Sequence, residues 1–168
     1  RAEGLPPPKE IEAAMARDIE RLKGMQNSDG GWPIWRKGEE SWPYYSIHAA
    51  HSLARAKQKG YVVPADTIQR AQDYLRDIER YIPSYYGQEA RRALIAYALY
   101  VRKLTGDADP ARARSLIKET GGVEKMPLEA LGWIMPTLSD DPNSKIEMEA
   151  IRRHLNNRVT ETAGAAHF

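Results

Sequence analysis

Residues 26–32, with the sequence QNSDGGW, constrain the fold of this chain more than any other segment. They follow an amphipathic helical pattern that ends at Met25, and they lead into an aromatic helix start at residues 41–45. A polar, glycine-rich turn that ends on a large aromatic side chain is suited to closing a helical hairpin. Repeated hairpins of this kind build α/α toroids, so the segment indicates an architecture and leaves the chemistry open.

Hydrophobic periodicity predicts about seven helices and no convincing strand. The first helix carries Ile11, Met15, Ile19 and Leu22 on one stripe, and the third carries a stripe that runs without a break from Ile68 to Ile82. Glycine, proline and capping residues set the expected boundaries. The predicted helices cover about residues 8–25, 41–60, 64–82, 86–104, 109–120, 127–138 and 142–159.

An internal repeat supports a hairpin array. Residues 60–64 and 106–110 share the form Gly-x-x-x-Pro, and each follows a helix end that carries Lys or Arg. Each also precedes an amphipathic helix, so the repeat length fits a unit of two helices.

The predicted helices alternate in character along the chain. The first, third, fifth and seventh have one apolar stripe, whereas the second, fourth and sixth are apolar almost all round. This alternation predicts an all-α fold: a two-layer array of helical hairpins that forms a partial α/α toroid over residues 8–168. Residues 1–7 are expected to be a linker stub. An irregular helical bundle is the alternative architecture.

Composition excludes several classes of function. The net charge is +2 with interspersed charges, so there is no nucleic-acid footprint. The longest uncharged apolar run, residues 93–101, is too short to span a bilayer, so no membrane contact by this segment is expected. Without cysteine, the chain has no disulfide, thiolate nucleophile or cysteine metal site. Both ends look cut, which suggests a segment excised from a larger protein.

Five motifs follow one another along the chain, at residues 18–32, 41–51, 56–64, 96–99 and 160–168. In this order they resemble the thioester-type, complement-like helical domain of bacterial α2-macroglobulins. The resemblance implies that the parent is an extracytoplasmic protease trap, a broad-spectrum endopeptidase inhibitor that is either periplasmic, with or without a membrane anchor in the parent, or secreted. Its partners would be target proteases, reached through the full-length parent, and the neighbouring macroglobulin β-sandwich domains.

The same resemblance implies a scaffold without catalytic residues. Many family members carry a Cys-x-Glu-Gln thioester, which the helical toroid shields from water, and this chain contains no cysteine. Complement relatives use a histidine whose place falls near residues 84–88, and no histidine occurs there. We therefore assign no catalytic residue, no cofactor and no metal site. The family toroid also has more helices, so an exposed apolar edge is expected.

Histidines and the opening turn could suggest metal chemistry. His48 and His51 lie three residues apart, near one face of a helix, but no third ligand has a recognisable spacing. They are interpreted as hydrogen-bonded polar residues of the inner layer, and His154 and His167 as structural. Asp29 is interpreted as part of a hairpin turn, because a calcium loop needs several more oxygen ligands.

Two further clusters have structural interpretations. The acidic cluster at residues 139–141 resembles terpene cyclase motifs, but Leu138 occupies the place of the protonating Asp, and Asp141 suits a helix start. Arg112 to Arg114 should lie on a solvated face. The aromatic residues are expected to plug the hairpin ends, with domain docking as the exception. They are Trp32, Trp35, Trp42, Tyr44, Tyr45, Tyr85 and Tyr86.

Two other functions remain open from the sequence. An enzyme of the terpenoid cyclase or prenyltransferase class would use the same toroid, and Gln26, Gly30 and Trp32 fit one copy of the triterpene cyclase turn repeat. A free-standing helical-repeat interaction module is the third hypothesis.

Overall fold

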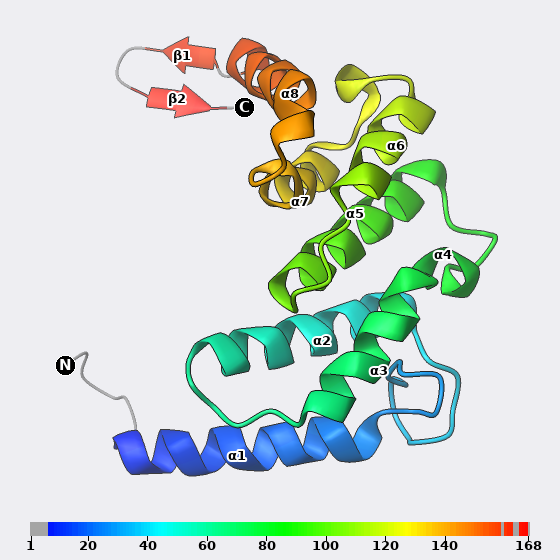
Figure 1. Ribbon diagram of the computed structural model, residues 1–168, viewed down its shortest axis with the longest axis vertical. Helices are drawn as coiled ribbons and strands as arrows, with labels where there is room; N and C mark the ends of the chain where they lie inside the picture. The colour runs from blue at the N-terminus through cyan, green and yellow to red at the C-terminus, as the bar shows by residue number, and fades with distance from the viewer. Residues whose placement is uncertain (1–6, 159, 163–164, 168) are drawn as a thin grey trace. The chain divides into compact units, whose positions relative to one another are not determined.

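The structure is a computed structural model that describes residues 7–158, 160–162 and 165–167. The predicted all-α array is confirmed (Figure 1). The helices are α1 (Pro8–Met25), α2 (Pro43–Gln58), α3 (Ala65–Arg76), α4 (Ile78–Tyr81), α5 (Gln88–Leu104), α6 (Pro110–Thr120), α7 (Leu128–Leu138) and α8 (Lys145–Arg158). Two 3-10 turns, η1 (Val123–Lys125) and η2 (Pro142–Ser144), precede α7 and α8.

One short β-hairpin follows the helices, so the expectation of no strand was wrong there. Strands β1 (Thr160–Thr162) and β2 (Ala165–His167) pair antiparallel, with Thr160 opposite His167. The two threonines of β1 are β-branched residues, which favour an extended backbone over a helix.

The chain divides into two compact units, residues 1–83 and residues 84–168. In the first unit α2 packs against both α1 and α3. Ile47, Ala50, Leu53 and Ala54 of α2 are at most 2% exposed. The alanines among them lack bulk, which allows neighbouring helices to approach closely.

The predicted third helix is interrupted at Asp77. The backbone of Asp77 has φ −99° and ψ 18°, which separates α3 from the one-turn helix α4. The predicted apolar stripe is nevertheless buried throughout, including Leu75 and Ile78 on either side of the break. The break therefore changes the helix and leaves the buried side of the segment unaltered.

In the second unit α5 and α7 pack side by side, and α6 contacts both. Leu99 and Val101 of α5 and Leu131 and Ile134 of α7 are at most 2% exposed. The indole of Trp133 stacks on Tyr97, with ring centroids 4.4 Å apart. Helix α8 packs on α7 and η1 through Ile151, which is fully buried.

The predicted contrast between helices is visible inside each unit. Helices α2, α5 and α7 bury residues on several sides, whereas Ile19 is the single buried residue of α1 and Ile151 that of the described part of α8. Helix α3 differs from the prediction, because it also buries the polar residues Thr67 and Gln72. Closure into part of a ring stays a prediction.

The Gly-x-x-x-Pro repeat marks two helix ends of the same geometry. Gly60 and Gly106 have φ of 91° and 88°. The amide that follows each glycine reaches back into the preceding helix: Tyr61 N donates to Ala56 O at 3.1 Å, and Asp107 N donates to Arg102 O at 2.9 Å. These are Schellman caps, in which glycine supplies the left-handed residue. The repeat is thus confirmed at the level of backbone geometry.

Candidate functional site

The buried amide of Gln26 connects the opening turn to α3. Gln26 is the first residue beyond α1, and it is 1% exposed. The Nε2 atom donates to Gly30 O at 2.9 Å and to Thr67 O at 3.0 Å. One side chain therefore closes the turn and joins it to the first turn of the next outer helix.

Asn27 and Asp29 tie the turn to the loop that precedes α2. Asn27 Nδ2 donates to Glu39 O at 2.7 Å and Ser41 Oγ at 2.9 Å, and Asn27 Oδ1 accepts from Gly38 N at 2.9 Å. Asp29 Oδ1 accepts from Gly31 N and Ser41 Oγ, both at 2.9 Å. Asp29 thus has the turn-forming contacts that its sequence context predicts.

Gly30 and Gly31 allow the turn to lie directly against α3. Gly30 has φ 89°, and a methyl group on it would lie 2.0 Å from the carbonyl oxygen of Arg70. A methyl group on Gly31 would lie 2.5 Å from the ring of Tyr74. Both glycines are therefore required by close backbone approach, and Gly30 also by its left-handed conformation.

Trp32 plugs the hairpin, as predicted. The residue is 3% exposed, and its indole Nε1 donates to Leu22 O in the last turn of α1 at 2.7 Å. Its backbone N donates to Ser46 Oγ of α2 at 2.8 Å. The side chain therefore satisfies a helix-end carbonyl while it fills the space between α1 and α2.

The plugging role is wrong for four of the other aromatic residues. Trp35 is 80% exposed, Tyr85 74%, Tyr44 51% and Tyr45 49%. Trp42 and Tyr86 are half-buried. A side chain at a hairpin end has no second layer above it, so an aromatic residue there is buried only where the turn folds back, as it does at Trp32.

The histidines do not form an inner-layer pair. His48 is exposed and stacks on Tyr44 with ring centroids 6.0 Å apart, which contradicts its predicted interior position. His51 is half-buried, and burial lowers its pKa, assisted by the positive charge of Arg55 and by electrostatic interaction with His48. His154 lies half-buried on α8. The backbone of His167 pairs with Thr160, and its side chain lies outside the described residues.

The acidic cluster anchors the corner between α7 and α8. Asp140 pairs with Lys103 of α5 at 2.8 Å, and hydrogen bonds from Lys103 and Ser139 lower its pKa. Asp141 accepts hydrogen bonds from the Ser144 hydroxyl, the Asn143 amide and Arg114 of α6.

These contacts, led by the bond from Ser144, lower the pKa of Asp141. Asp141 caps η2, the 3-10 turn that leads directly into α8, so its predicted place at a helix start is confirmed. Arg114 was expected on a solvated face, and its guanidinium instead pairs with Asp141.

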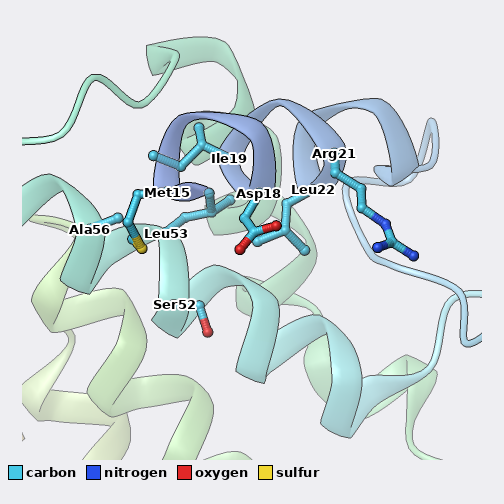
Figure 2. Close-up of a pocket in the computed structure, with 8 residues that line it drawn as sticks. All are labelled: Met15, Asp18, Ile19, Arg21, Leu22, Ser52, Leu53 and Ala56. Carbon is cyan, nitrogen blue, oxygen red and sulfur yellow. The ribbon is translucent and has the colours of Figure 1, made fainter. Parts of the chain in front are cut away.

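An open apolar groove lies between α1 and α2 and encloses about 430 Å³ (Figure 2). Met15, Ile19 and Leu22 of α1 face Leu53 and Ala56 of α2. The polar lining residues are Asp18, Arg21 and Ser52, and the guanidinium of Arg21 points away from the other side chains in Figure 2. Ile11, one turn before Met15 on the same stripe, is 37% exposed. The groove has the apolar character of the exposed edge expected from the sequence.

Sequence reasoning missed most of the partners that build these features. The bonds of Asn27, Ser41, Lys103 and Arg114 were missed, because each side chain bonds to a residue more than ten positions away. Ser41 was expected to cap the second helix, whereas Trp42 is the N-cap residue of α2. The described residues contain no group of three or more His, Cys, Asp or Glu side chains that could hold a metal ion. Within the same part of the chain, no helix is long and apolar enough to cross a membrane.

The chain is similar to two curated bacterial α2-macroglobulins. It is 32% identical to the protein of Rickettsia conorii over 95 aligned residues. These residues make up 55% of this chain and 5% of that protein. It is 27% identical to the protein of Escherichia coli over 129 aligned residues. These residues make up 73% of this chain and 8% of that protein. The chain therefore spans less than a tenth of these relatives, and no family model matches it.

Solved structures share the fold. A Salmonella α2-macroglobulin mutant matches with a TM-score of 0.77 at 24% identity, over 94% of this chain and 10% of that one. A fragment of native Escherichia coli α2-macroglobulin, from domain MG7 to the C-terminus, matches with a TM-score of 0.74 at 22% identity, over 90% of this chain and 24% of that one. These comparisons confirm the resemblance inferred from the motifs: the chain is similar to one part of a bacterial α2-macroglobulin.

Proposed function

We propose that this chain is a non-catalytic scaffold segment of a bacterial α2-macroglobulin-like protease trap, a broad-spectrum endopeptidase inhibitor. The similarity to bacterial α2-macroglobulins over most of the chain carries this proposal. In the parent, the segment would be part of the helical domain that shields or positions the thioester region. It would lie beside macroglobulin β-sandwich domains, in an extracytoplasmic protein.

The polar clamp of the first unit supports a scaffold role. Gln26, Asn27 and Asp29 use their side chains in bonds to the turn, to α3 and to the loop before α2. Such a network holds one backbone geometry through the Gln26 Nε2 donor and the side chains of Asn27 and Asp29, whereas the buried Oε1 of Gln26 has no hydrogen-bond partner among the described residues. A rigid turn is what a domain needs if it must hold a reactive segment in a fixed place.

The groove between α1 and α2 supports the proposal that this chain is one part of a larger helical domain. Its walls are apolar, and the stripe of α1 continues beyond it to the partly exposed Ile11. Apolar grooves between helices accept another amphipathic helix, whose side chains fill the space between the two ridges. We assign this place to a further helix of the parent domain, with residues 8–168 as the part contributed by this chain.

The proposal is tested in the full-length parent by substitutions at the rim of the groove. Met15→Glu places a charge where the added helix would pack, and we expect loss of protease retention by the parent. The assay incubates the parent with trypsin and compares cleavage of a large protein substrate with cleavage of a small peptide substrate. A trapped protease loses access to the large substrate and keeps access to the small one.

Ile146→Glu on α8 is the matched control, because Ile146 is 79% exposed and lies outside the groove. Retention that is unchanged in Met15→Glu, or lost equally in both variants, would exclude the groove from this role. Saturable binding of a prenyl diphosphate by the isolated chain would instead favour the cyclase or prenyltransferase class. An intrinsic catalytic rate of the chain would contradict the scaffold assignment itself.

A further inference from the structure

The second unit begins with a short non-helical segment, residues 84–87, ahead of α5. Tyr85 is 74% exposed, and its ring lies 5.2 Å from that of Tyr86. Ser84 and Tyr85 form a turn, and the backbone hydrogen bonds of normal geometry in the described loops include none from the amides of Ser84, Tyr85 or Tyr86. The segment is therefore an exposed aromatic pair on a turn that backbone hydrogen bonds hold only weakly.

The other strongly exposed aromatic residues lie on restrained backbone. Trp35 is exposed, but the residues directly after it are tied: Asn27 bonds to Gly38 N and Glu39 O, Glu39 Oε2 accepts from Arg36 N, and Glu39 N donates to Arg36 O. Tyr44 and Tyr45 lie inside the first turn of α2. Residues 84–87 thus combine exposure with a backbone that can leave its place at small cost in free energy.

That combination is the physical requirement for limited proteolysis. An endopeptidase must draw several residues of substrate into its cleft in an extended form, so helices and anchored loops have to open first. A protease with a hydrophobic primary pocket then selects the bond that follows an aromatic side chain.

We propose that residues 84–87 are a cleavage site for endopeptidases that select aromatic residues. Water adds across the peptide bond after Tyr85 or Tyr86. The carbonyl carbon takes the hydroxyl group and becomes the carboxylate of one product, and the nitrogen takes the proton and becomes the amine of the other. This inference treats the chain as a substrate of proteases, and it does not depend on the proposed scaffold role.

The cut falls at the boundary between the two compact units. The hydrogen bonds around Gln26 lie entirely in residues 1–83. The ion pairs of Arg102 with Asp107 and of Arg114 with Asp141 lie entirely in residues 84–168. Cleavage at this site therefore breaks chain continuity without removing a partner from either set of bonds.

The test is a time course of the intact chain with a low ratio of chymotrypsin, followed by intact-mass measurement of the fragments. We expect the first products to end at Tyr85 or Tyr86. The double variant Tyr85→Ala/Tyr86→Ala should lose this cut, and its half-life should lengthen by on the order of tenfold. Trp35→Ala is the matched control, and its half-life should equal that of the unaltered chain.

A second protease separates exposure from residue preference. Subtilisin, which has a broad preference, should also cut first within residues 82–88 in the unaltered chain and in any variant that retains its helical circular dichroism. First products from Trp35, Tyr44, Tyr45 or Tyr61 would overturn the proposal. So would an unchanged chymotrypsin half-life in the folded double variant.

Discussion

The side-chain amide nitrogen of Gln26 lies 3.0 Å from the backbone carbonyl oxygen of Thr67, across 41 positions of sequence. Both residues are at most 1% exposed, and the same nitrogen also donates to Gly30 O. This bond connects the end of α1 to the start of α3, so the two outer helices of the first unit share one buried polar group. Because a buried carbonyl without a partner is costly, the bond of the same nitrogen to Gly30 O adds to the stability of the turn.

Removing the Gln26 amide should therefore destabilise the first unit. Gln26→Ala removes the side-chain donor of Gly30 O and the bond that joins the turn to Thr67 O, which retains its place in the α3 helix, and we expect a loss of about 1–3 kcal/mol in the free energy of unfolding. Urea unfolding followed by helical circular dichroism measures it. Gln69→Ala removes the same side chain from an exposed face of α3 and should change stability by less than about 0.5 kcal/mol. Equal effects of the two substitutions would refute the importance of the buried bond.

Two glycines with the same backbone angle should respond differently to alanine. Gly30 and Gly60 have φ of 89° and 91°, but only Gly30 faces a neighbouring carbonyl, that of Arg70. Gly60→Ala should cost about 1–2 kcal/mol, the strain of a left-handed residue. Gly30→Ala adds a backbone clash and should cost at least about 3 kcal/mol or prevent folding of the first unit. Thermal unfolding of both variants measures the two losses of stability. A larger loss in Gly60→Ala than in Gly30→Ala would contradict the structure.

Trp32 and Trp35 form a natural pair of buried and exposed indoles. Trp32→Phe retains most of the buried ring but loses the bond to Leu22 O, so we expect a loss of about 1 kcal/mol or more. Trp35→Phe should leave stability unchanged within about 0.5 kcal/mol. Acrylamide quenching of tryptophan fluorescence gives an independent check, because Trp35→Phe should remove the most accessible emission and Trp32→Phe should not.

The corner at Asp141 should make stability depend on pH in the acidic range. Its pKa is lowered in the folded chain, so the ionised form is favoured by folding. This stabilisation is fully present above the ordinary pKa near 3.8, and it is lost as the pH falls through the lowered folded value. The urea midpoint of Asp141→Asn should therefore be lower than that of the unaltered chain. The difference between the two midpoints should be largest at neutral pH and should decrease as the pH falls.

Ser144→Ala tests the assigned cause of that pKa shift. The Ser144 hydroxyl makes the leading contribution, so its removal should raise the pKa of Asp141 toward its usual value and move the acid transition to higher pH. An NMR titration of the Asp141 carboxyl carbon reports the value directly. An unaltered titration in Ser144→Ala would assign the shift to Arg114 and the Asn143 amide instead.

Local patterns in the sequence predicted the helices well, because their signals lie within a few residues. The stripe from Ile68 to Ile82, the glycines at helix ends and Asp141 before Pro142 all act through neighbours in the chain. The break at Asp77 was not predicted, since the stripe continues through it without a change of spacing. The exposure of Trp35, Tyr44 and Tyr45 was also missed, because composition cannot tell which aromatic residue a turn folds over.

By itself, the sequence determined that this chain is helical, where its hairpins turn, and that Gly30, Gly31 and Trp32 form a closing turn. Each of these follows from local backbone preference and from the period of apolar residues. Only the tertiary structure decided that Gln26 bonds to Thr67, that Asp140 and Asp141 bind different helices, and that an apolar groove lies open beside α1. Those contacts join residues distant in sequence, and packing of whole helices selects them after local preferences are satisfied.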